Sequence, residues 1–345
     1  MTSFQGGLRD VSVAQPEFRS DPALHLLLEE AVPSGVERYV DLTPFVRWKV
    51  GGPAFALVTP SSEAETAAVL RLMSKRPEPL FVMGDASNLL FDTRGFDGVV
   101  MRIGRELSRT KIVDNRIYAQ SGVWVPYLAH RAANAGLSGL EHTIGIPGTL
   151  GGLVLMNGGS QRKGIGLNIL RVDCLDNDGA SFSLDQEECG FSYRRSALQG
   201  RNAVVVGAEL ELVPGDRRTI LREMIDIMIS RKSRFPKSLP NGGSTFLSDP
   251  AMYAEVGPPG AVIERLGLKG LVRGGAQISP QHANFIVNNG AATSDDILWL
   301  IHQIRTMAHD QTGFWMDAEV RFVAFDGKVS QAHEAAARRF EAKAA

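Results

Sequence analysis

Cysteine is scarce in this chain. The 345 residues include two cysteines, Cys174 and Cys189, which are not spaced as a C-x-x-C motif. A thiolate zinc site and a disulfide-rich framework both need more cysteines than this. We therefore expect two reduced thiols in an intracellular protein.

Long apolar runs and strong net charge are also absent. No uninterrupted apolar stretch reaches the roughly 18 residues that span a membrane, and the N-terminus MTSFQGGLRDVSVAQPEF has no long apolar core of a secretory signal. The formal net charge of -1 gives no global attraction to nucleic acid or to an anionic membrane. The sequence predicts a soluble, cytoplasmic protein, without nucleic-acid binding or membrane insertion, in which local basic residues hold any anionic ligand.

Metal-binding and phosphate-loop motifs are missing as well. The seven histidines include no H-E-x-x-H spacing, and the chain has no G-x-x-x-x-G-K-[ST] motif. His302 and His309 are a heptad apart on an expected helix, where surface or edge positions are the ordinary interpretation. We predict no metal site.

Glycine, in contrast, is concentrated in one stretch. Residues 136–159, GLSGLEHTIGIPGTLGGLVLMNGG, hold eight glycines among aliphatic residues, which suits neither an ordinary helix nor an ordinary strand. The core from Gly145 to Gly152 reads as a turn whose N–H groups can face an anion or a flat ring system. Glycine clusters also form tight loops that bind nothing, and this stretch alone leaves both interpretations open.

Two further glycine turns lie earlier in the chain. In LFVMGDASNLLF, residues 80–91, the segment from Gly84 to Asn88 separates two apolar runs, which predicts strand, tight turn and strand. In KVGGPA, residues 49–54, paired glycines precede the extended FALVTP. A dinucleotide lying across two subdomains is one economical reason for three such distant turns to converge.

The remaining pattern mixes helices with hairpins. The turn signal Asp176-Asn177-Asp178-Gly179 predicts a hairpin, which favours mixed or antiparallel sheet over the regular alternation of a Rossmann domain. We interpret the first forty residues as a loosely attached extension and the Ala-rich end as a solvated helix. We expect helices at 23–31, 61–73, 126–135, 217–231, 260–266 and 294–311, and strands near 55–60, 81, 99, 112–113, 116–120, 170–175, 182–184, 204–212, 277–278, 284–287 and 318–323.

Taken together, the motifs resemble the UDP-N-acetylenolpyruvoylglucosamine reductase family. From about Thr43 to Phe322 they are KVGGPA, GDASNLL, GLEHTIGIPGTLGG with Asn157, FSYRRS, GGSTF, GLKG, GGAQIS, HANFIVN and DAEVRF. The resemblance implies an α+β protein with an FAD-binding fold of the vanillyl-alcohol-oxidase and PCMH type in two lobes, plus a C-terminal α+β substrate-binding domain. We place an N-terminal extension at 1–40, the FAD-binding lobes at 41–105 and 106–215, the substrate-binding domain at 216–325 and a helical tail at 326–345.

The family makes UDP-N-acetylmuramate for bacterial cell-wall synthesis. The resemblance therefore implies that FAD, reduced by NADPH, passes hydride to UDP-N-acetylglucosamine enolpyruvate. Such a reduction also needs a group that stabilises charge on the substrate carboxylate and a proton donor. By resemblance, Arg194 and Glu319 stabilise the enolate and Ser244 donates the proton. Spacing alone does not choose between Asp317 and Glu319, but the family pattern chooses Glu319.

The resemblance also implies which residues bind ligands. Substrate binding falls to Tyr193, Arg231, Arg234 and His282. FAD binding falls to the three glycine turns and one asparagine, namely Gly51, Gly52, Gly84, Asp85, Ala86, Ser87, Asn88, Gly145, Ile146, Pro147, Gly148, Thr149, Gly151, Gly152 and Asn157.

Two departures from the family pattern leave alternatives open. Residues 246–250, FLSDP, lack the basic residue and the amide of the family's Phe-Lys/Arg-Asn-Pro run. Asp85 brings an acid into the pyrophosphate turn, which costs Coulomb energy unless its carboxylate points away or accepts N–H groups. The alternatives are a divergent paralogue that reduces another unsaturated acid in a specialised pathway, and a flavin-binding protein without turnover.

Overall fold

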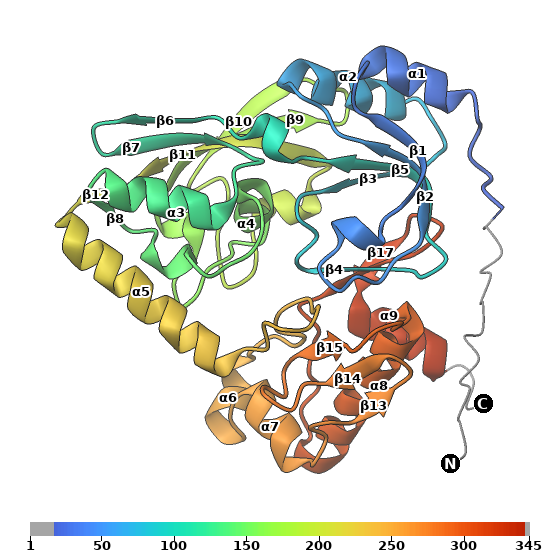
Figure 1. Ribbon diagram of the computed structural model, residues 1–345, viewed down its shortest axis with the longest axis vertical. Coiled ribbons are helices and arrows are strands. Elements are labelled where there is room, and N and C mark those ends of the chain that lie inside the picture. The colour runs from blue at the N-terminus through green and yellow to red at the C-terminus, as the bar shows by residue number, and fades with distance from the viewer. Residues whose placement is uncertain (1–16, 342–345) are drawn as a thin grey trace, which may run out of the picture.

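The first lobe combines a mixed sheet with two helices. The computed structural model describes residues 17–341. The elements of this lobe are α1 (Leu24–Ala31), β1 (Val36–Asp41), the 3-10 helix η1 (Thr43–Phe45), β2 (Pro53–Val58), α2 (Glu63–Met73), β3 (Leu80–Met83), β4 (Leu89–Phe91) and β5 (Phe96–Arg102). A four-stranded sheet runs in the order β1-β2-β5-β3, with β1 antiparallel to β2 and the other pairs parallel. Helices α1 and α2 lie together beside it (Figure 1).

Residues 17–40 are firmly part of this lobe. The β1 strand pairs with β2 along its length, and Leu24 and Leu28 of α1 are fully buried. The buried Asp97 carboxylate accepts the N–H groups of Arg19 and Ser20. The expectation of a loose attachment is therefore wrong for these residues, because one face of α1 carries enough apolar surface to join the core. Residues 1–16 of the expected extension lie outside the described residues.

The second lobe is organised around an antiparallel sheet. Its elements are η2 (Arg105–Leu107), β6 (Thr110–Val113), β7 (Arg116–Gln120), α3 (Val125–Asn134), β8 (Leu137–Ser138), η3 (Glu141–Thr143), α4 (Leu150–Leu155), η4 (Ile165–Leu167), β9 (Ile169–Asp176), β10 (Ser181–Asp185), η5 (Ala197–Gly200), β11 (Ala203–Glu211) and β12 (Val213–Pro214). Five strands run in the order β10-β9-β11-β7-β6. Gly179 has φ of 71° in the β9–β10 turn, and the Asp176 carboxylate accepts the N–H groups of Asp178 and Ala180. The predicted hairpin is confirmed.

The third lobe follows a long helix that leaves the second. Its elements are α5 (Arg217–Arg234), α6 (Pro250–Glu255), α7 (Pro259–Arg265), β13 (Val272–Arg273), β14 (Ala276–Ile278), β15 (Ile286–Asn288), α8 (Ser294–Thr312), β16 (Arg321–Val323), β17 (Val329–Gln331) and α9 (Ala332–Phe340). Figure 1 shows α5 running from the second lobe to the third. Thr293 and Asp296 form a capping box at the start of α8, and Gly313 ends it in the left-handed region, as its sequence predicts.

The end of the chain returns to the first lobe. Strand β16 pairs parallel to β4 and antiparallel to β17. The Asn88 side chain donates to the Glu319 carbonyl, and the Arg321 N–H donates to the Asn88 carbonyl. The strand expected at 318–323 begins only at Arg321, because residues 317–319 bond instead to residues 245–247. The pyrophosphate turn and the DAEVRF motif therefore lie side by side.

The C-terminal helix is packed rather than solvated. In α9, Ala332, Ala335 and Ala336 are buried against the core that includes α8, while Arg338 donates to the Ser330 hydroxyl at the surface. The solvated-helix interpretation was wrong because alanine side chains allow close helix packing on one face while charges occupy the other.

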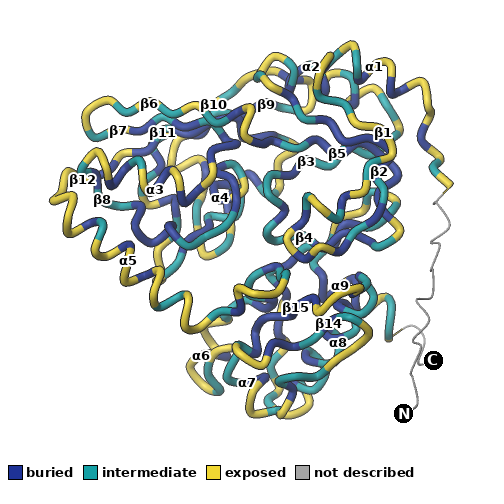
Figure 2. The backbone as a smooth tube through the Cα atoms, in the orientation of Figure 1, coloured by how far each residue is buried: buried dark blue, intermediate teal, exposed yellow. Residues whose placement is uncertain are grey.

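Buried positions in Figure 2 follow the sheets and the helix faces that cover them. The apolar cores cross the lobe boundaries: one joins Leu175 and Val204 of the second lobe to the first, and Trp48 of the first lobe lies in the core of the third. Its indole N–H donates to the Ile286 carbonyl at 2.8 Å, and the Asn288 amide donates to the Trp48 carbonyl at 2.9 Å. The lobes are therefore tied together beside the glycine pair of KVGGPA. The domain boundaries given above stay a prediction.

Candidate active site

A cavity of about 1010 Å³ is lined by residues from all three lobes. Its wall includes residues 84–89, residues 145–149 and residues 236–244, which are far apart in sequence. This volume is at the upper end of the roughly 300–1,000 Å³ typical of small-molecule sites. The fold thus brings together two of the three glycine turns and the GGSTF motif around space for a large ligand.

Some glycines of this wall stand where a side chain would not fit. A Cβ on Gly84 would collide with the Thr149 hydroxyl, and one on Gly151 would lie 2.9 Å from the Ser121 Cβ. Gly148 has φ of 145°, which disfavours other residues. Two glycine turns therefore meet closely and expose backbone to the cavity.

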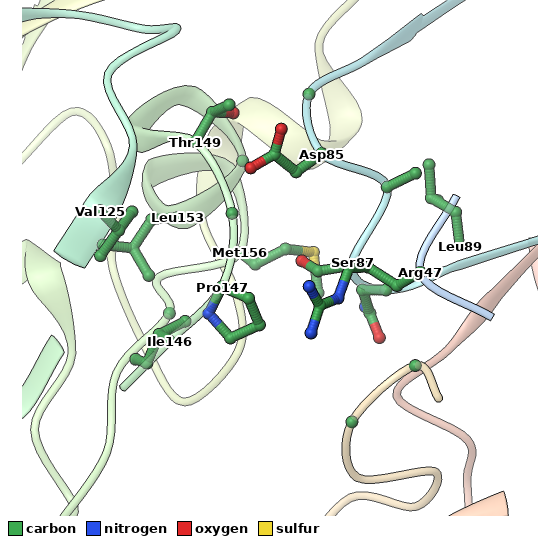
Figure 3. Close-up of a pocket in the computed structure, with 18 of the residues that line it drawn as sticks. Arg47, Asp85, Ser87, Leu89, Val125, Ile146, Pro147, Thr149, Leu153 and Met156 are labelled. Carbon is green, nitrogen blue, oxygen red and sulfur yellow. The ribbon is translucent and has the colours of Figure 1, made fainter. Parts of the chain in front are cut away.

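The cavity also offers the polar and apolar contacts that a flavin dinucleotide needs. The Ser121 hydroxyl is buried and has no hydrogen-bond partner among the described residues. Ile146, Pro147, Leu153 and Met156 present apolar side chains to the same space (Figure 3). An unpaired buried hydroxyl beside an apolar wall fits a ring system with a polar edge.

Asp85 lines the cavity beside the other residues of its turn. In Figure 3 its carboxylate points toward Thr149, and away from Arg47 and Ser87. Arg47, which is not among the predicted site residues, lines the cavity and supplies a positive charge there. The sequence has no specific signal for it, because the burial of Trp48 and Val50 next to the exposed Arg47 is seen only in the structure.

Three predicted cofactor residues do not line the cavity. A Cβ on Gly52 would collide with the Thr93 carbonyl, so this glycine allows two backbones to pack. Gly51 lies against Leu42. Asn157 supports a loop, because its carbonyl oxygen accepts the Gly166 N–H and its amide donates to the Ser192 carbonyl at 2.8 Å.

The loop that Asn157 supports presents Arg194 to the cavity. Arg194 has φ of 56°, a left-handed conformation that is rare for a residue with a Cβ. Its Nε lies 2.7 Å from Oε1 of Glu319, and the two side chains are 23% and 16% exposed. The Nε–H has no aligned acceptor among the described residues, so the contact is an ion pair that leaves donors for another anion.

Glu319 is a largely buried acid of the site. Burial raises the pKa of its carboxyl, and the charge of Arg194 opposes that rise. The Glu319 N–H donates to the Thr245 carbonyl at 2.8 Å, which places this residue beside the segment that carries Ser244. Ser244 lines the cavity and follows Gly243, whose φ is 82°. The three predicted catalytic residues therefore line one cavity.

Of the predicted substrate-binding residues, some line the cavity and others do not. Arg231 lines the cavity against Gly145, where a Cβ would collide with its guanidinium. Burial, followed by the charges of Arg234 and Arg194, lowers the pKa of Arg231. Arg234 and Tyr193 are exposed and do not line the cavity.

His282 lies outside the cavity, behind an aromatic wall. Its ring centre is 5.4 Å from that of Phe235 and 5.0 Å from that of Phe285, and both phenylalanines line the cavity. Its Nδ1 accepts the Asn284 N–H, and burial lowers its pKa. Contact with a ligand would therefore be indirect.

Sequence comparison identifies the family. Residues 54–185 match the model of an FAD binding domain, and residues 235–323 match that of the C-terminal domain of UDP-N-acetylenolpyruvoylglucosamine reductase. UDP-N-acetylenolpyruvoylglucosamine reductase 1 of Corynebacterium glutamicum is 50% identical over 297 residues, which cover 86% of this chain and 89% of that protein. The chain belongs to the UDP-N-acetylenolpyruvoylglucosamine reductase family.

Other members of the reductase family are also similar to this chain. The Heliobacterium modesticaldum enzyme is 41% identical over 281 residues, covering 81% of this chain and 88% of that protein. The crystal structure of UDP-N-acetylenolpyruvylglucosamine reductase from Thermus caldophilus superposes with a TM-score of 0.70 at 33% identity, covering 83% of this chain and 98% of that chain. The predicted fold, an FAD-binding fold of the PCMH type with a reductase C-terminal domain, is confirmed. The predicted enzyme class, a flavin-dependent oxidoreductase, is also confirmed.

The described part of the chain contains neither a metal-binding cluster nor a membrane-spanning helix. Within residues 17–341, no group of three or more histidine, cysteine, aspartate or glutamate side chains is placed to hold a metal ion. Over the same residues, no helix has both the length and the apolar character needed to cross a membrane.

Proposed function

We propose that this protein reduces UDP-N-acetylglucosamine enolpyruvate to UDP-N-acetylmuramate with NADPH and FAD, a step of peptidoglycan precursor synthesis. The observation that carries the proposal is the Arg194–Glu319 ion pair, 2.7 Å between Nε and Oε1, on the wall of the cavity that Ser244 also lines. Reductases 50% and 41% identical to the chain support it.

The cofactor belongs in the glycine-lined part of the cavity. Residues 84–88 and 145–152 would hold it, with Ser121 as an additional hydrogen-bonding group. Bound FAD would supply to the enolpyruvyl methylene carbon the hydride that it takes from NADPH. The apolar side chains of Ile146 and Leu153 exclude water from that region, which strengthens every charge interaction inside.

Arg194 and Glu319 receive the charge that this addition creates. When hydride joins the methylene carbon, the double-bond electrons move to the neighbouring carbon and its carboxylate. The always-charged guanidinium of Arg194 is suited to hold that carboxylate. Glu319 already has a raised pKa. A second carboxylate nearby would raise it further, which favours the protonated form that can donate a hydrogen bond to the substrate.

Ser244 completes the addition of two hydrogens across the double bond. Its hydroxyl gives a proton to the carbon that bears the carboxylate and regains one from water. A serine is a weak acid, so this step requires an oriented hydroxyl and a strongly basic carbon. Backbone hydrogen bonds from Thr245 to Asn284 and from Glu319 to Thr245 fix the position of the chain next to Ser244.

The altered FLSDP segment has a local structural role that does not require a different substrate. The Asp249 carboxylate accepts the Met252 N–H at 2.8 Å and starts α6, as an N-cap residue does. The Leu247 N–H donates to the Asp317 carbonyl. The altered residues therefore start a helix, and the preference for the cell-wall substrate rests on the similar reductases.

Product analysis tests the proposed reaction. The purified protein is incubated with NADPH and UDP-N-acetylglucosamine enolpyruvate, and the UDP-sugar is analysed by mass spectrometry. We expect a product heavier by two hydrogens, with one NADPH oxidised for each product. NADPH oxidation that is independent of the UDP-sugar, with the substrate recovered unchanged, would leave a flavoprotein with a different acceptor.

A further inference from the structure

The segment that carries Glu319 is held on one edge by the segment that carries Ser244. The Leu247 N–H donates to the Asp317 carbonyl at 2.9 Å, the Glu319 N–H donates to the Thr245 carbonyl at 2.8 Å, and Phe246 and Ala318 form an antiparallel bridge. The relative position of Glu319 and Ser244 thus depends on the backbone of residues 317–319.

The opposite edge of that segment is held by the start of α9. The Ala318 N–H donates to Nδ1 of His333 at 3.0 Å, and the Ala332 N–H donates to the Val320 carbonyl at 2.9 Å. His333 is 7% exposed, and its ring accepts the Ala318 N–H on the edge where no strand among the described residues pairs with this segment. A buried backbone N–H left without an acceptor is destabilising, so the ring is needed where it stands.

The contacts of His333 define its protonation state. A ring nitrogen that accepts from an N–H carries no hydrogen, so the proton resides on Nε2. That nitrogen lies 3.3 Å from Oδ1 of Asp317. Nη2 of Arg305 lies 3.7 Å from the same oxygen, and the Arg305 guanidinium is 4.2 Å from the centre of the Trp315 ring. The side chain and the backbone of residues 317–318 are therefore both fixed by neutral His333.

We propose that His333 is a positioning residue of this reductase, whose neutral ring holds the backbone next to Glu319 so that the carboxyl meets Arg194 and the substrate. The proposal rests on the proposed function. His333 lies beyond residues 235–323, which match the C-terminal domain model of the family. The role therefore belongs to the C-terminal helix of this chain.

The proposal predicts a response to acid. The charged groups that face the ring are Asp317 before β16, Arg305 of α8 and Glu334 of α9 itself. Burial lowers the pKa of His333, Asp317 raises it and Arg305 lowers it, with a net lowering. The acceptor is therefore present at neutral pH. Below this lowered pKa, Nδ1 carries a proton and the ring faces the Ala318 N–H as a second donor.

Two substitutions of His333 distinguish the role of its Nδ1 from that of its Nε2. The side-chain oxygen of His333→Asn reaches the position of Nδ1 and can accept from the Ala318 N–H, without titrating. The longer side chain of His333→Gln places its oxygen near the position of Nε2, where it cannot. His333→Ala removes both contacts. His130→Asn is the matched control, since His130 is exposed on α3.

The experiment follows the two half-reactions of the flavin separately. In the proposed reaction Glu319 acts on the enolpyruvyl substrate, and no role is assigned to it in the transfer from NADPH. His333→Ala and His333→Gln should therefore slow reoxidation by the substrate roughly 10- to 100-fold, the scale on which small displacements affect catalysis. Flavin reduction by NADPH and FAD content should be unchanged. His333→Asn and His130→Asn should react like the wild type, and only His333→Asn should lose the decline in reoxidation at acidic pH.

Two results overturn the proposal. One is a normal reoxidation rate in His333→Ala. The other is an equal loss of both half-reactions, which would indicate general destabilisation instead of positioning. The wild-type arm tests the proposed function separately. If the wild-type flavin is not reoxidised by the substrate, the reaction and the role of His333 in it fail together. Wild-type turnover with an unaffected His333→Ala variant removes the positioning role alone.

Discussion

Replacing Arg194 by methionine tests the charge stabilisation that we propose for this residue. Arg194→Met keeps much of the apolar volume and removes the cation 2.7 Å from Glu319. Groups that stabilise charge developing in a transition state contribute about 100- to 1,000-fold to turnover, or roughly 2.7–4 kcal/mol. We expect a loss of that size in flavin reoxidation by the substrate, with flavin reduction by NADPH retained.

The same substitution should make stability depend on pH in a definite direction. Burial already raises the pKa of Glu319, and the Arg194 charge restrains that rise. A raised pKa in the folded state gives stability that is present at low pH and lost as pH rises through the folded pKa. Without Arg194 the pKa of Glu319 rises further. The difference in unfolding free energy between wild type and Arg194→Met should therefore grow from pH 5 to pH 8.

Stopped-flow absorbance and urea unfolding measure these two effects. Arg195→Met is the control, because Arg195 is the exposed neighbour in the same turn. The double variant Arg194→Met with Glu319→Gln should remove the added pH dependence, since no carboxyl remains. Full reoxidation by Arg194→Met, or an unfolding difference that is the same at pH 5 and pH 8, would refute the reasoning about this pair.

Three further predictions follow from particular contacts. Gly52→Ala should lower the free energy of unfolding, measured in urea, by about 1–3 kcal/mol, because the new Cβ would collide with the Thr93 carbonyl. Gly200→Ala is the control and should have no such effect, because no atom lies within 4 Å of the new Cβ. Arg231→Met removes a partly buried charge, so it should raise the melting temperature of the protein without substrate and should weaken substrate binding measured by calorimetry. A lower melting temperature, or unchanged substrate binding, would contradict this. Burial lowers the pKa of His142 to about 4, so the wild type should lose up to roughly 3 kcal/mol of stability as pH falls from 6.5 to 4, and a His142→Leu variant should lose less.

The sequence was sufficient for most elements and for the identity of the three catalytic candidates. Local signals such as the capping box at Thr293 and the turn at Gly179 are fixed by neighbouring residues, so they can be read without the fold. The FSYRRS, GGSTF and DAEVRF motifs gave Arg194, Ser244 and Glu319, and the structure places all three on one cavity.

The errors concern packing that only tertiary structure determines. The burial of α1 and α9 depends on the surface that each helix packs against. The sequence pattern of an Ala-rich helix does not show whether its apolar face contacts water or α8. The support role of Asn157 and the contact of His333 with Ala318 both join residues that no local pattern relates. Arg47 was missed because a lone basic residue beside a tryptophan has no specific signature.

Anaerobic reaction of the reduced protein tests the central claim most directly. The flavin of the purified yellow protein is reduced with NADPH, UDP-N-acetylglucosamine enolpyruvate is added, and flavin absorbance near its visible maximum is followed. The account predicts rapid reoxidation with formation of UDP-N-acetylmuramate. A flavin that NADPH reduces but the UDP-sugar leaves reduced would contradict the proposed substrate while keeping the cofactor.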